Sequence, residues 1–301
     1  MKASMIRLAA FVVPALVFFA VTDALAITLF AGTGKHDGGR IITIDSTTGV
    51  GTLVGSSGSN EVSGLAFDSA GTLFGVTGGS TGPSALITVN TSTGVGTLVG
   101  NIATGGGTGN NGFAGLAFDS AGTLFASGWS GTGELWTLNK TNAAQTFVGT
   151  ITGCTGNNFV AGISFSPSGT LFGSRGGSSG HVEDLVTLNK STAACTPIGS
   201  GSSGANNIAD IVFDLSSGTL FGVTGGSDSQ LLTINPVTGA ETMIGLIGFN
   251  NVSSLAVPRG VAPPPTHHGP IPTLGEWGVL TMVIFLAATA LWTIRSRRPI
   301  A

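Results

Sequence analysis

The feature that most constrains the fold of this chain is an internal repeat. The segment Gly64-Leu-Ala-Phe-Asp-Ser-Ala-Gly-Thr-Leu-Phe74 recurs with small changes from Gly115, Gly162 and Asp210, and its first part returns at Ser254. The steps between these starting points are 51, 47, 48 and 44 residues. Repeats of roughly 40–50 residues that hold several short strands are typical of the blades of a β-propeller.

Each repeat contains four short segments of β-forming residues. In the first complete repeat they are Leu65–Phe67, Thr72–Val76, Leu86–Val89 and Thr97–Val99, named here strands a, b, c and d from the centre of a blade outwards. Pro197 falls in a d strand, which fits an outer edge because proline cannot donate to a ladder. The chain has 50 Gly among 301 residues. This proportion disfavours an ordinary helical enzyme and suits many tight turns.

The two ends of the repeat region complement each other. The region begins at Ile27–Phe30, which matches strand b, and finishes at Ser254–Val257, which matches strand a. It therefore holds five copies of each strand. We predict an all-β fold over residues 27–258, a five-bladed β-propeller of four-stranded antiparallel blades, closed by pairing of the C-terminal strand with the N-terminal strands. Closure removes exposed sheet edges. An open β-solenoid is the alternative, but it does not require complementary ends.

The N-terminal residues 1–26 have the pattern of a secretory signal peptide. Lys2 and Arg7 precede the apolar stretch Leu8–Val21, and Ala24 and Ala26 supply small residues at the −3 and −1 positions of a cleavage site. We predict cleavage after Ala26 and export of the remainder. A retained membrane anchor is the alternative, although the apolar stretch is short for a membrane span.

The C-terminal region contains a predicted transmembrane helix over residues 277–294. This stretch carries no charged residue and is followed by Arg295, Arg297 and Arg298. As a helix it extends roughly 27 Å, close to the thickness of a bilayer core. The arginines are expected to stay in the cytoplasm, which places the rest of the chain outside.

Directly before this helix stands Ile271-Pro-Thr-Leu-Gly-Glu-Trp-Gly278. Residues 271–301 as a whole resemble the IPTL-CTERM sorting signal of Gram-negative bacteria, a relative of the PEP-CTERM signal. The residues that carry the resemblance are Ile271, Pro272, Thr273, Leu274, Trp277, Gly278, Arg295, Arg297 and Arg298. A simple C-terminal anchor is the alternative.

The resemblance implies a pathway for the whole protein. An exosortase-type membrane protease is the implied partner, acting on an inner-membrane-anchored precursor. The implied destination is the cell surface or the extracellular matrix, often in association with exopolysaccharide genes. The repeats themselves resemble those of secreted bacterial propeller proteins, but their motifs describe strands and turns and therefore imply a fold without a chemistry.

Between the repeats and the signal, residues 259–270 form a Pro-rich linker, which favours an extended spacer. Segment 27–270 carries 6 basic and 12 acidic residues, a net charge of −6. This balance argues against nucleic acid as a partner. The adjacent His267 and His268 are weak evidence for a metal, so no metal site and no cofactor are predicted.

The best candidates for ligand binding are polar pairs that precede each a strand. In a propeller these d-to-a connections open beside the central axis, so the pairs are expected to ring one end of it. Their amides are suited to hydrogen-bonding a sugar or holding a cation. The alternative is that they cap turns and tie blades together. The pairs are Asn60 and Glu61, Asn110 and Asn111, Asn157 and Asn158, Asn206 and Asn207, and Asn250 and Asn251.

An enzymatic function is disfavoured by the sequence. Nucleophilic catalysis requires a Ser or Cys near a His, but the repeat region has only His36 and His181, both in b-to-c connections. Metal hydrolysis requires several carboxylates or histidines, and Glu61 is the only acid among the polar pairs. Asp68, Asp119 and Asp214 stand at one turn position and are interpreted as turn caps.

We therefore predict an exported, non-enzymatic protein of the cell surface or matrix with a binding or structural role. The first alternative is a propeller that binds a carbohydrate or small ligand, with an exopolysaccharide or surface glycan as a further partner. A hydrolase or lyase with its site at the axis is less favoured.

The two cysteines give conflicting signals. An even pair in an exported protein favours a disulfide between Cys154 and Cys195. The topology argues against it, because Cys154 falls in a d-to-a connection whereas Cys195 starts a d strand. This predicts positions at opposite ends of the blades, beyond the limit of about 7 Å between Cα atoms.

Overall fold

The computed structural model describes residues 26–78, 84–102, 112–128, 133–154, 159–175, 185–199 and 208–259. The chain divides into two compact units, residues 1–259 and 260–301, and every described residue belongs to the first. The predicted signal peptide, apart from Ala26, and the predicted helix 277–294 lie outside the described residues. Within the described ranges, no helix is long and apolar enough to cross a membrane.

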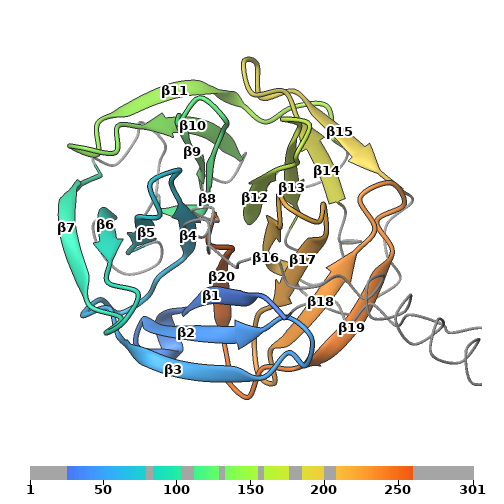
Figure 1. Cartoon of the computed structure of the whole chain (residues 1–301). Helices are drawn as coiled ribbons and strands as arrows, with labels where there is room; N and C mark the ends of the chain where they lie inside the picture. The colour runs from blue at the N-terminus through green and yellow to red at the C-terminus, as the bar shows by residue number, and fades with distance from the viewer. Residues whose placement is uncertain are drawn as a thin grey trace, which may run out of the picture. The chain divides into compact units, whose positions relative to one another are not determined.

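The described residues form twenty strands in five sheets of four, arranged as blades around one axis (Figure 1). The innermost a strands are β20 (Val252–Ala256), β4 (Gly64–Phe67), β8 (Phe113–Phe118), β12 (Gly162–Phe165) and β16 (Ile208–Phe213). The b strands are β1 (Thr28–Thr33), β5 (Leu73–Thr77), β9 (Leu124–Gly128), β13 (Leu171–Ser174) and β17 (Leu220–Thr224). The c strands are β2 (Arg40–Asp45), β6 (Ala85–Val89), β10 (Glu134–Leu138), β14 (Leu185–Leu188) and β18 (Gln230–Ile234). The outer d strands are β3 (Gly51–Ser56), β7 (Gly96–Asn101), β11 (Gln145–Thr150), β15 (Cys195–Ile198) and β19 (Glu241–Leu246).

The predicted closure of the ring is confirmed. Strand β20 pairs antiparallel with β1, with Phe30 opposite Ala256 and Gly32 opposite Ser254, so blade 1 has the order β20-β1-β2-β3. Blades 2 to 5 follow in chain order. Each a strand contacts the a strands of both neighbouring blades, including β20 with β4 and β16. The open β-solenoid is therefore wrong.

Antiparallel order places the connections at two ends of the ring axis. The a-to-b and c-to-d turns lie at one end, which we term the turn face. The b-to-c and d-to-a connections, together with the 3-10 helix η1 (Lys35–Asp37), lie at the other end, which we term the connection face. Because β1 begins and β20 ends on the turn face, Ile27 and Arg259 both lie there.

The hydrophobic core consists of five clusters, one at each seam between neighbouring blades. Four seams contain an edge-to-face pair of Phe rings, formed by the b strand of one blade and the a strand of the next. Centroid distances are 5.0–5.5 Å for Phe30–Phe67, Phe74–Phe118, Phe125–Phe165 and Phe172–Phe213. At the closing seam Val257 joins the cluster of Phe221 instead. The repeated Phe of the sequence motif therefore holds blade to blade.

The structure contradicts the expectation that the two cysteines are far apart. Cys154 and Cys195 form a disulfide with a Cα–Cα distance of 5.4 Å. The N–H of Cys195 also donates to the carbonyl oxygen of Thr152 at 2.7 Å. The reason is blade twist, which turns each outer strand along the rim (Figure 1). The end of one d strand consequently meets the start of the next, and the cysteines flank that junction between blades 3 and 4.

Candidate functional site

Two of the five predicted polar pairs lie within the described residues, both in d-to-a connections on the connection face. Asn60 is exposed, and Glu61 is only 5% exposed. Asn250 is exposed, and its Oδ1 accepts a hydrogen bond from the N–H of Asp228 at 3.0 Å. The remaining members of the pairs lie outside the described residues: Asn110, Asn111, Asn157, Asn158, Asn206 and Asn207.

Asn251 joins three connections at the junction of blades 5 and 1. Its backbone is left-handed, with φ of 50°, a conformation that Asn adopts more readily than most residues. Its N–H donates to the carbonyl oxygen of Gly226 at 2.6 Å, and its own carbonyl oxygen accepts from the N–H of Gly34 at 2.7 Å. Its side-chain Nδ2 donates to Asp37 Oδ2 at 2.7 Å. Asn251 therefore acts as a tie between blades, the structural alternative to ligand binding.

The five pairs do not stand at equivalent positions relative to the inner strands. The a strands align through the residues that face equivalent b-strand positions, namely Gly64, Gly115, Gly162, Asp210 and Ser254. Counted back from these residues, Glu61 and Asn251 stand three positions earlier, whereas Asn111 and Asn158 stand four earlier. The pairs thus lie at different sequence distances from the inner strands, and the binding role of the pairs stays a prediction.

The carboxylates on the turn face cap the turns between strands a and b. Asp68 Oδ1 accepts hydrogen bonds from the N–H groups of Ala70 and Thr72 at 3.0 and 2.9 Å. Asp119 makes the same two bonds in blade 3, at 3.0 and 2.9 Å. In blade 4, Ser166 takes this place and accepts from the N–H of Thr170 at 3.1 Å. Each turn is therefore closed by its own side chain.

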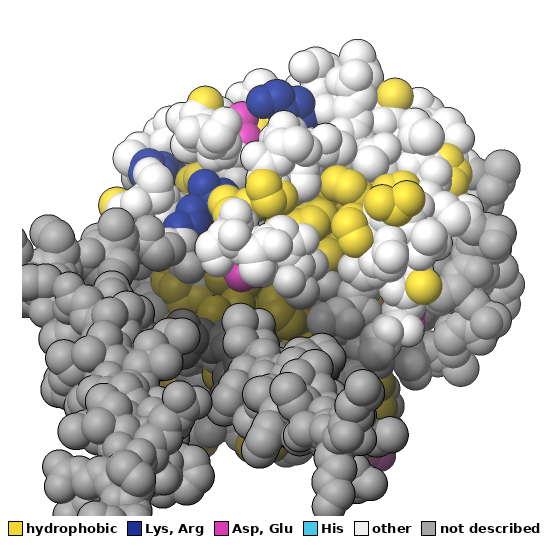
Figure 2. Space-filling view, turned by 45° about the vertical axis from the view of Figure 1, so that its right-hand side comes forward, with side chains coloured by type: hydrophobic (Ala, Val, Ile, Leu, Met, Phe, Trp, Pro, Cys, Tyr) yellow, Lys and Arg dark blue, Asp and Glu magenta, His cyan; other side chains and the backbone are white. Residues whose placement is uncertain are grey.

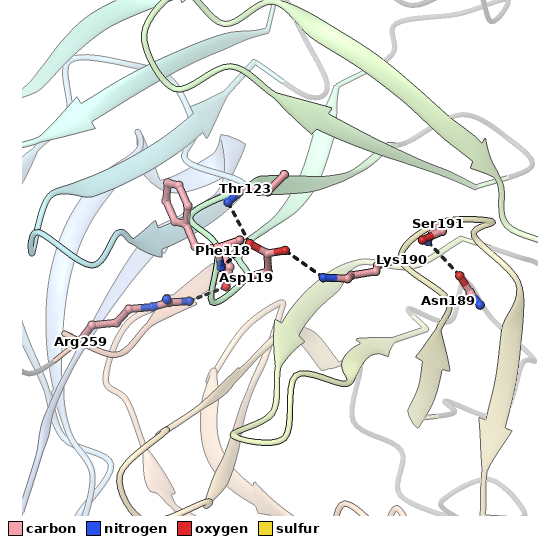
Figure 3. A network of polar contacts seen from close by, with 8 residues as sticks. Phe118, Asp119, Thr123, Asn189, Lys190, Ser191 and Arg259 are labelled. Carbon is pink, nitrogen blue, oxygen red and sulfur yellow. Dashed lines mark hydrogen bonds and ion pairs between the residues drawn. The ribbon is translucent and has the colours of Figure 1, made fainter.

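The second oxygen of each of these two carboxylates binds a lysine of the next blade. Lys140, in the c-to-d turn of blade 3, lies 2.9 Å from Asp68 Oδ2 of blade 2. Lys190 of blade 4 lies 3.0 Å from Asp119 Oδ2 of blade 3 (Figure 3). Each ammonium also stands 5.9 Å from the centroid of a Phe ring, Phe118 or Phe165, within cation–π range. One aspartate thus closes its own turn and fastens the neighbouring blade.

These contacts set the ionisation of the two aspartates. Burial alone raises the pKa of Asp68, but the hydrogen bonds from Lys140 and Thr72 outweigh it, and the pKa lies below its ordinary value. For Asp119 burial also raises the pKa, and the bonds from Thr123 and Lys190 again bring it below the ordinary value. Both side chains are therefore charged at neutral pH, although their relative exposures are only 5% and 6%.

Arg259 adds a cation at the turn face that the sequence did not single out. It is the first residue of the predicted linker, yet its guanidinium donates to the carbonyl oxygen of Phe118 in blade 3 (Figure 3). Burial lowers the pKa of Arg259, and the charges of Asp119 and Asp68 act in the opposite direction. The contact therefore attaches Arg259, which follows strand β20 of blade 1, to blade 3, which is not adjacent to blade 1.

A signal for the Lys–Asp fastenings was present in the sequence. Lys140 and Lys190 both follow the Asn that caps a c-to-d turn, and the Asp of the preceding blade is present in both cases. In blade 5 the lysine position holds Pro236, and the preceding blade has Ser166 in place of Asp. Lysine in one blade thus occurs together with aspartate in the preceding blade, which predicts that the two side chains are in contact. This pattern becomes visible only when the repeats are aligned in the order of the blades.

In the part of the chain that the structure describes, no group of three or more His, Cys, Asp or Glu side chains is placed to hold a metal ion. The carboxylates of Asp68 and Asp119 instead accept hydrogen bonds from backbone N–H groups and lysines. The carboxylate of Asp214 accepts from the N–H and hydroxyl groups of Ser216 and Ser217. The polar side chains of the described residues mainly form hydrogen bonds and ion pairs that close turns and join neighbouring blades.

Comparison with known proteins identifies the C-terminal region. Residues 270–298 match the IPTL-CTERM motif. The chain carries an IPTL-CTERM sorting signal. The resemblance proposed from Ile271 to Gly278 and the basic tail is thereby confirmed, and it implies an exported, surface-directed protein. None of the curated proteins matches the chain.

Solved structures match the propeller at low sequence identity. One, a crystal structure of a nidogen/laminin complex, has a TM-score of 0.50 and 17% identity over 77% of this chain and 81% of that chain. The calcium-binding protein regucalcin of Agrobacterium tumefaciens has a TM-score of 0.44 and 16% identity, covering 78% and 79%. TolB of Acinetobacter baumannii has a TM-score of 0.44 and 12% identity, covering 72% and 52%. At these identities the likeness concerns the fold alone.

Proposed function

We propose that this IPTL-CTERM protein is a non-enzymatic component of the bacterial cell surface or extracellular matrix with a binding or structural role. In this proposal the leader directs export, and an exosortase-type protease processes the C-terminal signal at the inner membrane. The sorting signal supports the destination. The propeller supplies the part that remains after processing.

The observation that carries the non-enzymatic role is how the repeated residues are used. The recurring Phe residues form the ring pairs at the seams. The recurring Asp residues cap turns, and two of them fasten the next blade through Lys140 and Lys190. The features that repeat from blade to blade therefore serve cohesion of the ring. This use of the repeated residues is expected if the role of the propeller at the surface is to be a stable domain that carries few charges.

The sorting step is tested with the full chain in a Gram-negative host that has an exosortase. Wild type and Pro272→Ala are followed by immunoblotting of inner-membrane, surface and medium fractions. We expect the variant to accumulate as an unprocessed membrane form, because Pro272 belongs to the motif. Pro263→Ala, in the linker, is the matched control and should be processed like wild type. Identical processing of Pro272→Ala and wild type would contradict the proposal.

The non-enzymatic role is tested by a turnover screen against glycosidic, ester and lactone substrates. We expect no turnover above a denatured sample. Glu61 is the acid of the polar pairs, so the informative variant is Glu61→Gln. Activity that is present in wild type and lost in Glu61→Gln would overturn the proposal and favour a hydrolase or lyase.

A second candidate function is carbohydrate or small-ligand binding on the connection face. It is favoured by the exposure of Asn60 and Asn250 on that face. Glycan and cation screens on the exported protein would test it, with Asn60→Ala combined with Asn250→Ala as the binding variant. A hit that this variant loses supports the candidate, and a hit that it retains places binding elsewhere.

A further inference from the structure

Blade 3 departs from the repeat at a group of neighbouring positions. Its c strand carries Glu134 and Trp136, and its d strand carries Phe147 opposite Trp136. In blades 1, 2 and 5 the pairs that correspond to Trp136 and Phe147 are aliphatic: Ile42 and Leu53, Ile87 and Leu98, and Leu232 and Met243. The residues that correspond to Glu134 are Arg40, Ala85 and Gln230. The blade fold does not require the residues of blade 3, because three other blades form without them.

A further change in blade 3, at the end of its b strand, makes room for the indole. In blades 1 and 5 a threonine ends the b strand, and its Oγ1 accepts a hydrogen bond from the N–H of the first c-strand residue, at 2.9 Å for Thr33 and 2.8 Å for Thr224. Blade 3 has Gly128 at this position. A Cβ at Gly128 would lie 3.3 Å from Trp136 Nε1, which is tighter than an ordinary contact. Blade 3 therefore lacks this threonine hydrogen bond and gains space for the tryptophan.

The side chains of this group are in contact with one another. Trp136 Nε1 donates to Glu134 Oε2 at 3.0 Å. The indole ring packs edge-to-face against the buried Phe113, with 6.3 Å between centroids, and against Phe147, with 4.9 Å and an angle of 64° between the ring planes. Trp136 and Glu134 are partly buried, and Phe147 is 48% exposed. The two inclined rings and the carboxylate thus form a fixed group at the surface, which we term the aromatic corner (Glu134, Trp136 and Phe147).

The aromatic corner carries one negative charge in surroundings that are poor in charge. The connections on the connection face that border blade 3, residues 102–112, 129–133 and 151–161, contain no Asp, Glu, Lys or Arg. Among the described residues, no lysine or arginine forms an ion pair with Glu134. Charged side chains are also sparse on the face of the molecule that Figure 2 shows. Because segment 27–270 has a net charge of −6 as well, the ligand complementary to this corner is a cation.

We propose that the aromatic corner binds an organic ammonium group, such as the trimethylammonium group of choline. The faces of aromatic rings attract cations that lie within about 6 Å of the ring centroid, and pairs of rings are a common way to hold quaternary ammonium groups. The two centroids are 4.9 Å apart, and Glu134 Oε2 lies 3.0 Å from the indole nitrogen. One cation can therefore contact both rings and lie beside the carboxylate. This inference gives a ligand class to the binding role proposed above, at a site separate from the polar pairs.

The test is a titration of choline chloride, at constant ionic strength, into the exported protein purified from cells grown with ¹⁵N-labelled tryptophan. NMR follows the indole N–H signal of Trp136, which is assigned with Trp136→Phe. We expect a saturable shift with a Kd of about 1–10 mM, because cation–π contacts at a partly exposed site are individually weak. Dimethylbutanol, the neutral carbon analogue of choline, should bind at least about threefold more weakly because it has no charge.

Two variants introduce a residue that another blade already carries, so the fold is expected to be retained. Glu134→Gln gives blade 3 the residue of Gln230, and Phe147→Leu gives it the residue of Leu53. Each variant should raise the Kd for choline at least about threefold. Leu98→Ala changes the position of blade 2 that corresponds to Phe147 and is the matched control, which should leave the Kd unchanged. Thermal unfolding of each variant checks the fold.

The proposal is overturned if the Trp136 signal of wild type shows no saturable shift with choline, or if dimethylbutanol binds as tightly as choline. It is also overturned if both variants bind choline as wild type does. None of these results bears on sorting, so the fractionation of Pro272→Ala tests the surface location independently.

Vesicles distinguish two sources of the ammonium group. Retention of wild type, but not of Phe147→Leu, on phosphatidylcholine vesicles would assign the site to a lipid headgroup. Binding of choline without retention on these vesicles would assign it to an ammonium group that is free or carried by a polymer.

Discussion

At the residue scale, Asp210 is the most unusual feature of the ring. It occupies a position that the other inner strands fill with Gly or Ser, and it lies directly against Gly162 of blade 4. The side chain is fully buried. Its Oδ2 accepts from the N–H of Leu255 in β20 at 2.8 Å, and its Oδ1 accepts from the N–H of Ile211 at 2.8 Å. Asp210 thus links blade 5 to the strand that closes the ring.

This position makes stability depend on pH. Burial raises the pKa of Asp210 well above its ordinary value, despite two opposing backbone hydrogen bonds. A group with a raised pKa in the folded state contributes stability that is complete below its unfolded pKa of about 3.9 and is lost as pH rises through the folded value. We expect the free energy of unfolding of wild type to fall, relative to Asp210→Asn, as pH rises from about 4 to 8.

Urea unfolding of both proteins across this range measures the effect. The readout is how the difference in free energy of unfolding between wild type and Asp210→Asn changes with pH. Its absolute value is less informative, because the lost acceptor in Asp210→Asn adds a constant penalty of about 1–3 kcal/mol. Asp119→Asn is the control of opposite sign. The pKa of Asp119 is lowered, so its contribution is present above about pH 4 and is lost only as pH falls below that value, and the series for this control therefore extends to about pH 2. A difference in free energy of unfolding between wild type and Asp210→Asn that does not change with pH would contradict a raised pKa of Asp210 in the folded state.

At the element scale, the outer strands show what the sequence could and could not predict. The strands themselves were predictable, because each lies between turn residues at a regular spacing, and Pro197 correctly indicated an outer edge. The bulges in β3, β7, β11 and β19 were not predictable, because Leu53 and Val54 are both apolar and their alternation gives no sign of which faces outward.

The error over the disulfide has the same origin. A connection pattern assigns Cys154 and Cys195 to opposite ends of a flat blade, but strand twist is a three-dimensional property that spacing does not contain. The candidate site was predictable in the same partial way. The Asp turn caps follow from local sequence, whereas the bonds to Lys140 and Lys190 join residues 72 and 71 positions apart. Such contacts depend on how the blades stack.

The disulfide itself is expected to stabilise the blade 3–4 junction. It closes a loop with a sequence separation of 41 residues. Loss of such a cross-link removes about 3–5 kcal/mol in the chain-entropy treatment. Strand β15, which starts at Cys195, is also the outer strand with only four residues and a proline. Cys154→Ser combined with Cys195→Ser should therefore lower the free energy of unfolding by that amount in chemical denaturation.

Reducing agent provides the internal control for this measurement. Dithiothreitol should destabilise wild type towards the value of the double variant and leave the double variant unchanged. Equal stability of wild type with and without reductant, once thiol titration shows complete reduction, would contradict the stabilising role.

At the scale of the whole molecule, the ring has one strand pair that no short connection holds together. Within blades 2 to 5 the paired strands follow one another in sequence, but β1 and β20 are separated by almost the whole repeat region. Their pairing is therefore the costliest in loop-closure entropy. Leu255 of β20 is 1% exposed and lies in the cluster at the seam between blades 5 and 1, which also contains Leu29 and Phe221.

The ring is accordingly expected to open first between β1 and β20. Leu255→Ala should lower the free energy of unfolding by about 2–5 kcal/mol, and so should Leu65→Ala at the equivalent position of blade 2, which is also 1% exposed. The two variants should differ in native-state hydrogen exchange. Leu255→Ala should accelerate exchange of the amides that pair Phe30 with Ala256, whereas Leu65→Ala should leave them close to wild type. Equal acceleration at this pair in both variants would mean that the ring opens as a unit, with no weakest junction at its closure.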